Sequence, residues 1–169
     1  VSDIARASGM SKELVSYRMR KLGKKGIIRG YYAVIDVPRL GYLFYRILIK
    51  LQGLKEENKF IEYLKNLNSV SWIGSLDGDW DMVVLIWAKN PIEFKKTYDS
   101  ILHKYNSFFQ DTSVSIATKI YHYTHNYLFN TDDHDDLTLG KKFETQQIDK
   151  TDISIINELS KNCRTPILD

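Results

Sequence analysis

The sequence predicts an α+β protein with three parts. They are a helix-turn-helix (winged-helix-like) region, a ferredoxin-like βαββαβ domain and an extra C-terminal helix. Two helix patterns flank Gly9, alternating strand and helix patterns run from residue 43 to residue 124, and a further apolar helix pattern begins near residue 149. We expect the parts at residues 1–36, 43–124 and 148–169, with linkers at 37–42 and 125–147.

The composition is that of a globular chain. The 169 residues are 43% hydrophobic and 12% aromatic, which is enough to form the core of one or two small domains. The single cysteine, Cys163, cannot pair within the chain and fits a reducing compartment. No apolar run approaches the roughly 18 to 20 residues of a membrane span, so we expect a cytoplasmic protein.

Positive charge is concentrated at the amino end. Residues 1–30 hold eight Lys and Arg against Asp3 and Glu13, a balance of +6. Residues 31–124 balance at +1 and residues 125–169 at −4, within a total of +3. This distribution predicts that the first thirty residues face a polyanion.

The first two helices are expected around a short glycine turn. Residues 2–8 form one helix pattern, and Ser11 is a good N-cap for a second. Apolar residues of the second helix fall on one side and basic residues on the other, and Gly23 and Gly26 are expected to stop it. The next nine residues, 27–35, are rich in β-branched and aromatic side chains and predict a strand, such as a small wing.

Residues 43–124 carry the pattern of a split βαβ domain. Strands are expected at 43–51, 70–76, 80–88 and 112–123, and helices around 60–67 and 91–105. Asp77-Gly78-Asp79 is a hairpin-turn signal, and Asn90-Pro91 supplies an N-cap followed by proline at the first helical position.

The third strand of this domain is apolar on both faces. One face is expected to carry Met82, Val84 and Ile86, and the other Asp81, Val83, Leu85 and Trp87. Helices cover only one face of a ferredoxin-like sheet, so the other face needs a partner. A homodimer, or a higher oligomer, formed through this domain is therefore expected.

Two separate motifs resemble one family. The stretch from Gly9 to Leu22, followed by Gly26-Ile27-Ile28-Arg29-Gly30-Tyr31, resembles the DNA-binding end of the leucine-responsive and asparagine-regulator (Lrp/AsnC) family of prokaryotic transcription regulators. Val70-Ser71-Trp72-Ile73 with Gly78-Asp79-Trp80-Asp81 is similar to its effector domain. The resemblance spans roughly residues 2–124 and implies transcription regulation, double-stranded DNA as partner, and control by a small metabolite such as an amino acid.

The C-terminal helix pattern is similar to the first DNA-binding helix of that family. The pattern runs from Ile148 to Leu159 and is followed by Asn162-Cys163-Arg164. In the family, this helix comes before the position of residue 1. Two explanations stay open. The chain is a piece of a longer or tandemly repeated regulator, or the terminal helix docks onto residues 2–22, of its own chain or a neighbour, and completes a three-helix unit.

The second helix supplies the candidates for DNA contact. A recognition helix reads bases with its N-terminal and solvent-facing residues, and other basic residues contact phosphates. The expected base contacts are Lys12, Glu13, Ser16, Tyr17 and Arg20. The expected phosphate contacts are Arg18, Lys21, Lys24, Lys25 and Arg29.

The hairpin turn supplies the candidate effector site. Gly78, Asp79 and Asp81 could hold the two ends of a free amino acid, and the resemblance implies that effectors lie near this turn, between dimers. The alternative, equally weighted, is that these residues only form the turn.

Other chemistry finds little support. His122 and His125 face opposite sides of a predicted strand, and Asp132 to Asp136 lacks the spacing of a calcium loop, so no metal or other cofactor is expected. An enzyme resembling the haem-pathway decarboxylases, using His103, His122 or Arg46, is one alternative, and a sensor without DNA contact is another. Neither an enzyme nor a sensor of this kind requires a net charge of +6 on residues 1–30, so we expect that the protein is not an enzyme.

Overall fold

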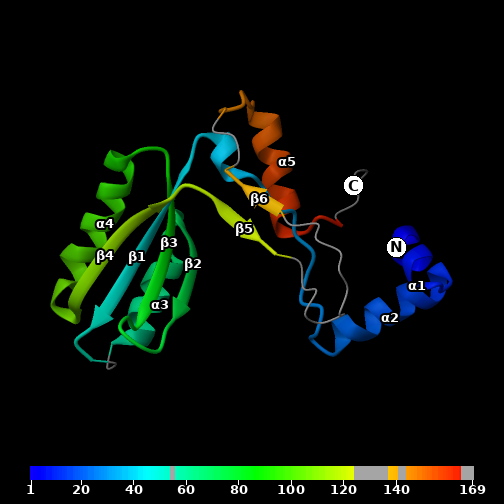
Figure 1. Cartoon of the computed structure of the whole chain (residues 1–169), viewed down its shortest axis with the longest axis horizontal. Helices are drawn as coiled ribbons and strands as arrows, with labels where there is room; N and C mark the ends of the chain where they lie inside the picture. Colours follow the sequence, from blue (N-terminus) through cyan, green and yellow to red (C-terminus); the bar gives the residue numbers. More distant parts are fainter. Residues whose placement is uncertain (54–55, 124–136, 141–143, 165–169) are drawn as a thin grey trace. The chain divides into compact units, whose positions relative to one another are not determined.

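The computed structural model describes residues 1–53, 56–123, 137–140 and 144–164 (Figure 1). Contacts divide the chain into two compact units. One unit contains Val1–Ile35 together with the segment that begins at Ile148, and the other is Asp36–Gln147.

The first unit contains helices α1 (Ser2–Ser8), α2 (Lys12–Lys24) and α5 (Lys150–Lys161). Gly9 ends α1 in the left-handed region at φ 63°, which glycine adopts without a steric cost. The Ser11 hydroxyl accepts a hydrogen bond from the Leu14 N–H at 3.2 Å and caps α2. Asp149 caps α5 in a reciprocal pair of hydrogen bonds with Asp152. The prediction of two helices around a glycine turn is confirmed.

One prediction for this region holds in part, and one is wrong. Gly23 does not stop α2, which continues to Lys24, whereas Gly26, with φ 72°, ends it as predicted. Residues 27–35 form no strand, because a strand requires a partner that pairs along its length. Two backbone hydrogen bonds instead join Tyr31 and Ala33 to the end of α5.

The second unit is built on one antiparallel sheet. Its elements in chain order are β1 (Leu43–Leu51), α3 (Glu57–Lys65), β2 (Val70–Ser75), β3 (Met82–Ala88), α4 (Pro91–Tyr105) and β4 (Phe109–Ala117), with short 3-10 helices at Val37–Leu40 and Asn106–Phe108. The strand order β2-β3-β1-β4 confirms the ferredoxin-like βαββαβ fold.

The final predicted strand is shorter than expected. It begins at Phe109 and ends at Ala117, and β5 (Ile120–His122) then pairs with β6 (Leu137–Leu139) in a separate two-stranded sheet. Strand β6 therefore lies inside the segment 125–147 that was predicted as a linker. The predicted linker 37–42 includes the 3-10 helix and the buried Pro38. Residues 125–136, with His125 and the acidic run, lie outside the described residues.

Helices α3 and α4 cover one face of the sheet. Buried side chains from β1 and β3 meet those of the helices in a single core; the largest are Tyr45, Ile47, Ile49, Met82, Ile86, Phe60, Leu64 and Ile101. The Tyr45 ring stacks on Phe94 of α4 with centroids 4.2 Å apart. Each large apolar side chain buried here contributes roughly 1.5–3 kcal/mol to stability.

The opposite face of the sheet is also apolar. Phe44, Leu85 and Trp87 lie on it half-buried, and Trp72 of β2 remains 52% exposed. The Trp72 ring lies over Gly74, where an added Cβ would approach the ring to 2.4 Å. The prediction that β3 is apolar on both faces is confirmed.

The turn between β2 and β3 is tied to the end of β1. The Asp81 carboxylate accepts a hydrogen bond from the Leu51 N–H at 2.8 Å and lies 3.3 Å from the Lys50 ammonium, which also donates to the Gly78 carbonyl. The Leu51 N–H, and then Lys50, lower the pKa of Asp81. Gly78 has φ 134°, a conformation that favours glycine.

Asp81→Asn should destabilise the second unit at neutral pH, since it removes the charge paired with Lys50. A carboxyl with a lowered pKa in the folded state stabilises the fold above its ordinary pKa of about 4, and this contribution is lost as the pH falls through the folded value. The difference in thermal midpoint between wild type and variant should therefore shrink as the pH falls below about 4. Asp79→Asn, exposed in the same turn, is the control. A difference that stays constant with pH would contradict this role of Asp81.

Candidate nucleic-acid interface

Helix α2 has one buried side and one polar side. Val15 is only 2% exposed, whereas Glu13, Tyr17, Arg20 and Lys24 are exposed. Residues on an α-helix are about 100° apart, so these four lie in an arc about 60° wide and opposite Val15. We call these four residues the polar arc of α2.

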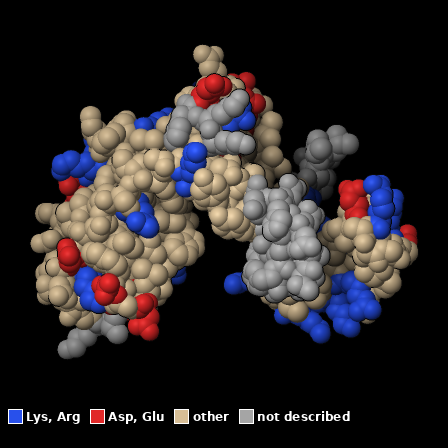
Figure 2. All heavy atoms as spheres, in the orientation of Figure 1, with Lys and Arg blue, Asp and Glu red and all other residues tan. Residues whose placement is uncertain are grey.

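The remaining candidates flank this arc. Lys12 and Ser16 lie to one side of it, and Arg18 and Lys21 to the other. Lys25 and Arg29 follow the helix, and both are exposed. Figure 2 shows Lys and Arg side chains gathered over α2. The structure thus brings the ten predicted DNA-contact residues onto one helix and the turn after it, with Ser16 alone partly buried.

The one acidic residue on the polar arc is in the first turn of the helix. The backbone N–H of Glu13, and then the Ser11 hydroxyl, lower the pKa of the Glu13 carboxyl. A carboxylate is also favoured at this position because the N-terminus of a helix carries a partial positive charge. Glu13 therefore presents an acceptor beside the basic side chains.

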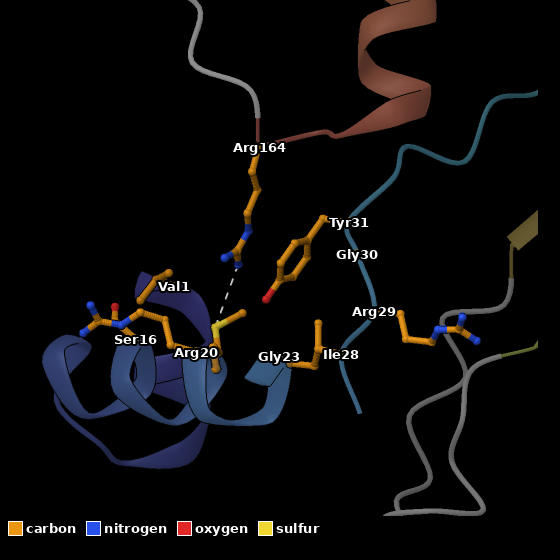
Figure 3. Close-up of a pocket in the computed structure, with 10 residues that line it drawn as sticks. Val1, Ser16, Arg20, Gly23, Ile28, Arg29, Gly30, Tyr31 and Arg164 are labelled. Atoms are coloured by element: carbon orange, nitrogen blue, oxygen red, sulfur yellow. Dashed lines mark hydrogen bonds between the residues drawn. The ribbon is translucent and has the colours of Figure 1, made fainter. Parts of the chain in front are cut away.

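A cavity of about 600 Å³ adjoins the polar arc. It lies between Met19 and Gly23 of α2, the segment from Ile28 to Tyr31, and Arg164 (Figure 3). The side chains of Arg20 and Arg29 at its rim point away from it (Figure 3). The sequence left open that the C-terminal helix docks onto residues 2–22, but it did not identify Arg164 as a residue that lies beside α2.

The predicted effector residues have different surroundings. Asp81 is engaged with Leu51 and Lys50, and the carbonyl of Gly78 accepts from Lys50. Both residues therefore hold the turn. Asp79 is exposed, which leaves its carboxylate facing solvent.

The candidate enzyme residues are not brought together. His103 is exposed on α4, on the helix-covered side of the sheet, whereas Arg46 donates a hydrogen bond to Ser115 on the opposite face. His122 lies in β5, and it has an interaction partner. In the described part of the chain there is no group of three or more His, Cys, Asp or Glu suited to a metal ion. No described helix has the length and hydropathy needed to cross a membrane.

Known proteins support this architecture. A family model for winged helix-turn-helix DNA-binding proteins matches residues 1–29. The transcriptional regulator FL11 of Pyrococcus horikoshii is 33% identical over 103 residues, covering 59% of this chain and 66% of that protein. LrpA of Pyrococcus abyssi, another transcriptional regulator, is 31% identical over 93 residues, covering 53% and 63%. The chain thus spans slightly less than two thirds of the length of these relatives.

Solved structures show the same fold. The structure of E. coli AsnC aligns with a TM-score of 0.60 at 20% identity, covering 69% of this chain and 78% of that one. A feast or famine regulatory protein from M. tuberculosis, complexed with L-methionine, aligns with a TM-score of 0.60 at 22% identity over the same shares. The helix-turn-helix match, the β2-β3-β1-β4 sheet and these relatives together support the resemblance of this chain to the Lrp/AsnC family of transcription regulators.

Proposed function

We propose that this chain acts as a sequence-specific DNA-binding transcription regulator in the cytoplasm, with α2 as the helix that enters the major groove. The observation that carries this proposal is the polar arc, because it faces away from the buried Val15 and is bordered by lysine and arginine on both sides. A helix of 13 residues is about 20 Å long and fits a groove about 12 Å wide.

The positions around α2 suggest a division of roles. Arg20 lies within the arc, where a guanidinium can pair with both acceptors of a guanine. The Glu13 carboxylate can accept a hydrogen bond from a cytosine amino group. Tyr17 lies beside Arg20 and Lys24 around a hollow of the surface. The proposed phosphate contacts outside the arc are Arg18, Lys21, Lys25 and Arg29. Lys24, at the C-terminal end of the arc, is also placed to contact a phosphate.

Arg20→Ala should relax base preference at one position of the operator by about 1–3 kcal/mol, because one specific pair with a base is lost. Lys24→Ala should weaken binding to specific and random duplexes alike, because a phosphate contact carries no sequence information. Affinity selection from genomic fragments, followed by titration of selected and scrambled duplexes, measures both effects. Equal losses on the two duplexes for Arg20→Ala would refute its role.

We also propose that the ferredoxin-like domain dimerises through the uncovered face of its sheet. Trp72, Phe44 and Leu85 lie beside one another there with Arg46, around a hollow of about 420 Å³. An apolar surface of this kind is favourably buried against a second copy, and a two-fold arrangement closes the assembly. Two copies would present two recognition helices at a fixed spacing to two half-sites.

Trp72→Glu should raise the dimer dissociation constant about tenfold or more, since it places a charge where an aromatic side chain would be buried. Sedimentation equilibrium over a range of concentrations gives the constant. Ile92→Glu changes an equally apolar but 71% exposed residue at the start of α4 and serves as control. If Trp72→Glu dimerises like wild type while Ile92→Glu does not, the interface lies elsewhere.

The exposed turn is the proposed place for an amino-acid effector. Asp79 is an exposed carboxylate of the turn, and the M. tuberculosis neighbour was solved with L-methionine. A ligand would regulate by binding one assembly or DNA-competent geometry better than another.

Asp79→Ala should raise about tenfold the L-methionine concentration that gives a set increase in thermal midpoint. The reason is that a charge-assisted hydrogen bond to the ammonium group of the ligand would be lost. The midpoint without ligand should change little. A panel of free amino acids in the same assay identifies the preferred effector. An unfolded Asp79→Ala protein, or one stabilised as well as wild type, would indicate that Asp79 serves the turn alone.

A further inference from the structure

The first unit buries very little of its apolar surface. Helices α1 and α2 bury Ala5 and Val15, and α5 has no buried residue. Several apolar side chains of these three helices remain exposed, among them Ile4, Leu14, Ile153, Ile155 and Leu159. Helices of 7 to 13 residues are marginal in isolation and depend on tertiary contacts. Any further contact in this unit therefore has a large effect on how firmly α2 is held.

The end of α5 supplies such contacts. The Cys163 N–H donates to the Tyr31 carbonyl at 3.0 Å, and the Ala33 N–H donates to the Leu159 carbonyl at 3.2 Å. One hydrogen bond runs in each direction, so two chain segments far apart in sequence are held side by side. We call residues 159–164 together with 31–33 the terminal clamp.

Arg164 extends this clamp to α2. Its guanidinium lies 3.6 Å from the centroid of the Tyr31 ring, and its Nη2 lies 3.8 Å from the sulfur of Met19 (Figure 3). Met19 and Tyr31 are both partly buried and line the cavity beside the polar arc. A single side chain thus contacts the helix and the segment that follows it.

We propose that the terminal clamp makes the C-terminal segment a working part of the DNA-binding unit, with Arg164 as a positioning residue that holds α2 against residues 28–31. Without it, α2 is held mainly by the small contact around Ala5 and Val15. The consequence for DNA affinity rests on the proposed function, whereas the clamp itself does not.

Proximity is tested first. Cys163 is the single cysteine, so Tyr31→Cys creates a chain with two. The 3.0 Å hydrogen bond from the Cys163 N–H to the Tyr31 carbonyl brings the two backbones close enough for the Cα separation of roughly 4.4–6.8 Å that a disulfide spans. With oxidised glutathione as oxidant, Tyr31→Cys should form a disulfide within one chain, seen by intact mass and on a non-reducing gel.

Tyr17→Cys is the matched control for this experiment. Tyr17 lies two residues from Met19 and thus roughly 200° around α2, away from Arg164. It should keep free thiols under the same conditions. Free thiols in Tyr31→Cys, or disulfides only between two chains, would overturn the proposal.

The positioning role needs a measurement without DNA. Hydrogen exchange in the full chain should become roughly fivefold faster at amides of residues 16–31 in Arg164→Ala, the loss expected for one cation–π contact. Arg164→Lys should also exchange faster, because an ammonium lacks the planar stacking of a guanidinium. Lys161→Ala, which removes only an exposed pair with Glu158, is the control and should match wild type.

DNA titrations of the same variants complete the test. Arg164→Lys should lose affinity along with Arg164→Ala, whereas an Arg164 that merely contacted phosphate would be replaced by lysine with little loss. Unchanged exchange in Arg164→Ala overturns the proposal, even if DNA affinity falls. If Arg164→Ala exchanges faster but the wild-type protein binds no duplex, the clamp stands and the proposed function is refuted.

Discussion

Helix α2 must stay exposed along the polar arc while the unit that carries it has almost no core. Val15 and Ala5 fix one side of the helix, and the Ser11 hydroxyl caps its start. Further contacts that position α2 come from the turn at Gly26 and from Arg164, whose guanidinium lies against both Met19 and the Tyr31 ring. The second unit differs, because two helices and a four-stranded sheet enclose a continuous core.

This contrast assigns different physical tasks to the two units. A sheet domain with a continuous core can hold an exposed turn in a fixed geometry, and Asp81 ties the turn proposed for the effector to β1. A small, lightly packed unit can adapt to a groove, and its exposed charge supplies attraction to phosphates at long range. Two segments far apart in sequence meet in that unit, because backbone hydrogen bonds join Leu159 to Ala33 and Cys163 to Tyr31.

Sequence patterns predicted the elements that are set by local chemistry. Gly9 and Ser11 marked the turn and the cap, Asn90 and Pro91 marked the start of α4, and the alternation in β3 predicted its two apolar faces. The errors concern pairing over distance. Residues 27–35 have strand composition but no pairing strand, and β4 ends at Ala117 because β5 pairs with β6 instead. Composition also placed charge on α2 correctly, but it could not reveal that Arg164 lies beside Met19.

The salt dependence of duplex binding by the full chain shows whether α2 binds DNA. Five proposed phosphate contacts per copy predict that the logarithm of the association constant falls with the logarithm of salt concentration with a slope of about −4 to −5 for each bound copy. Such a slope, reduced by about 1 in Lys24→Ala, is the predicted result. Affinity that barely changes with salt, or no binding at low salt, would contradict the assignment of α2 to DNA.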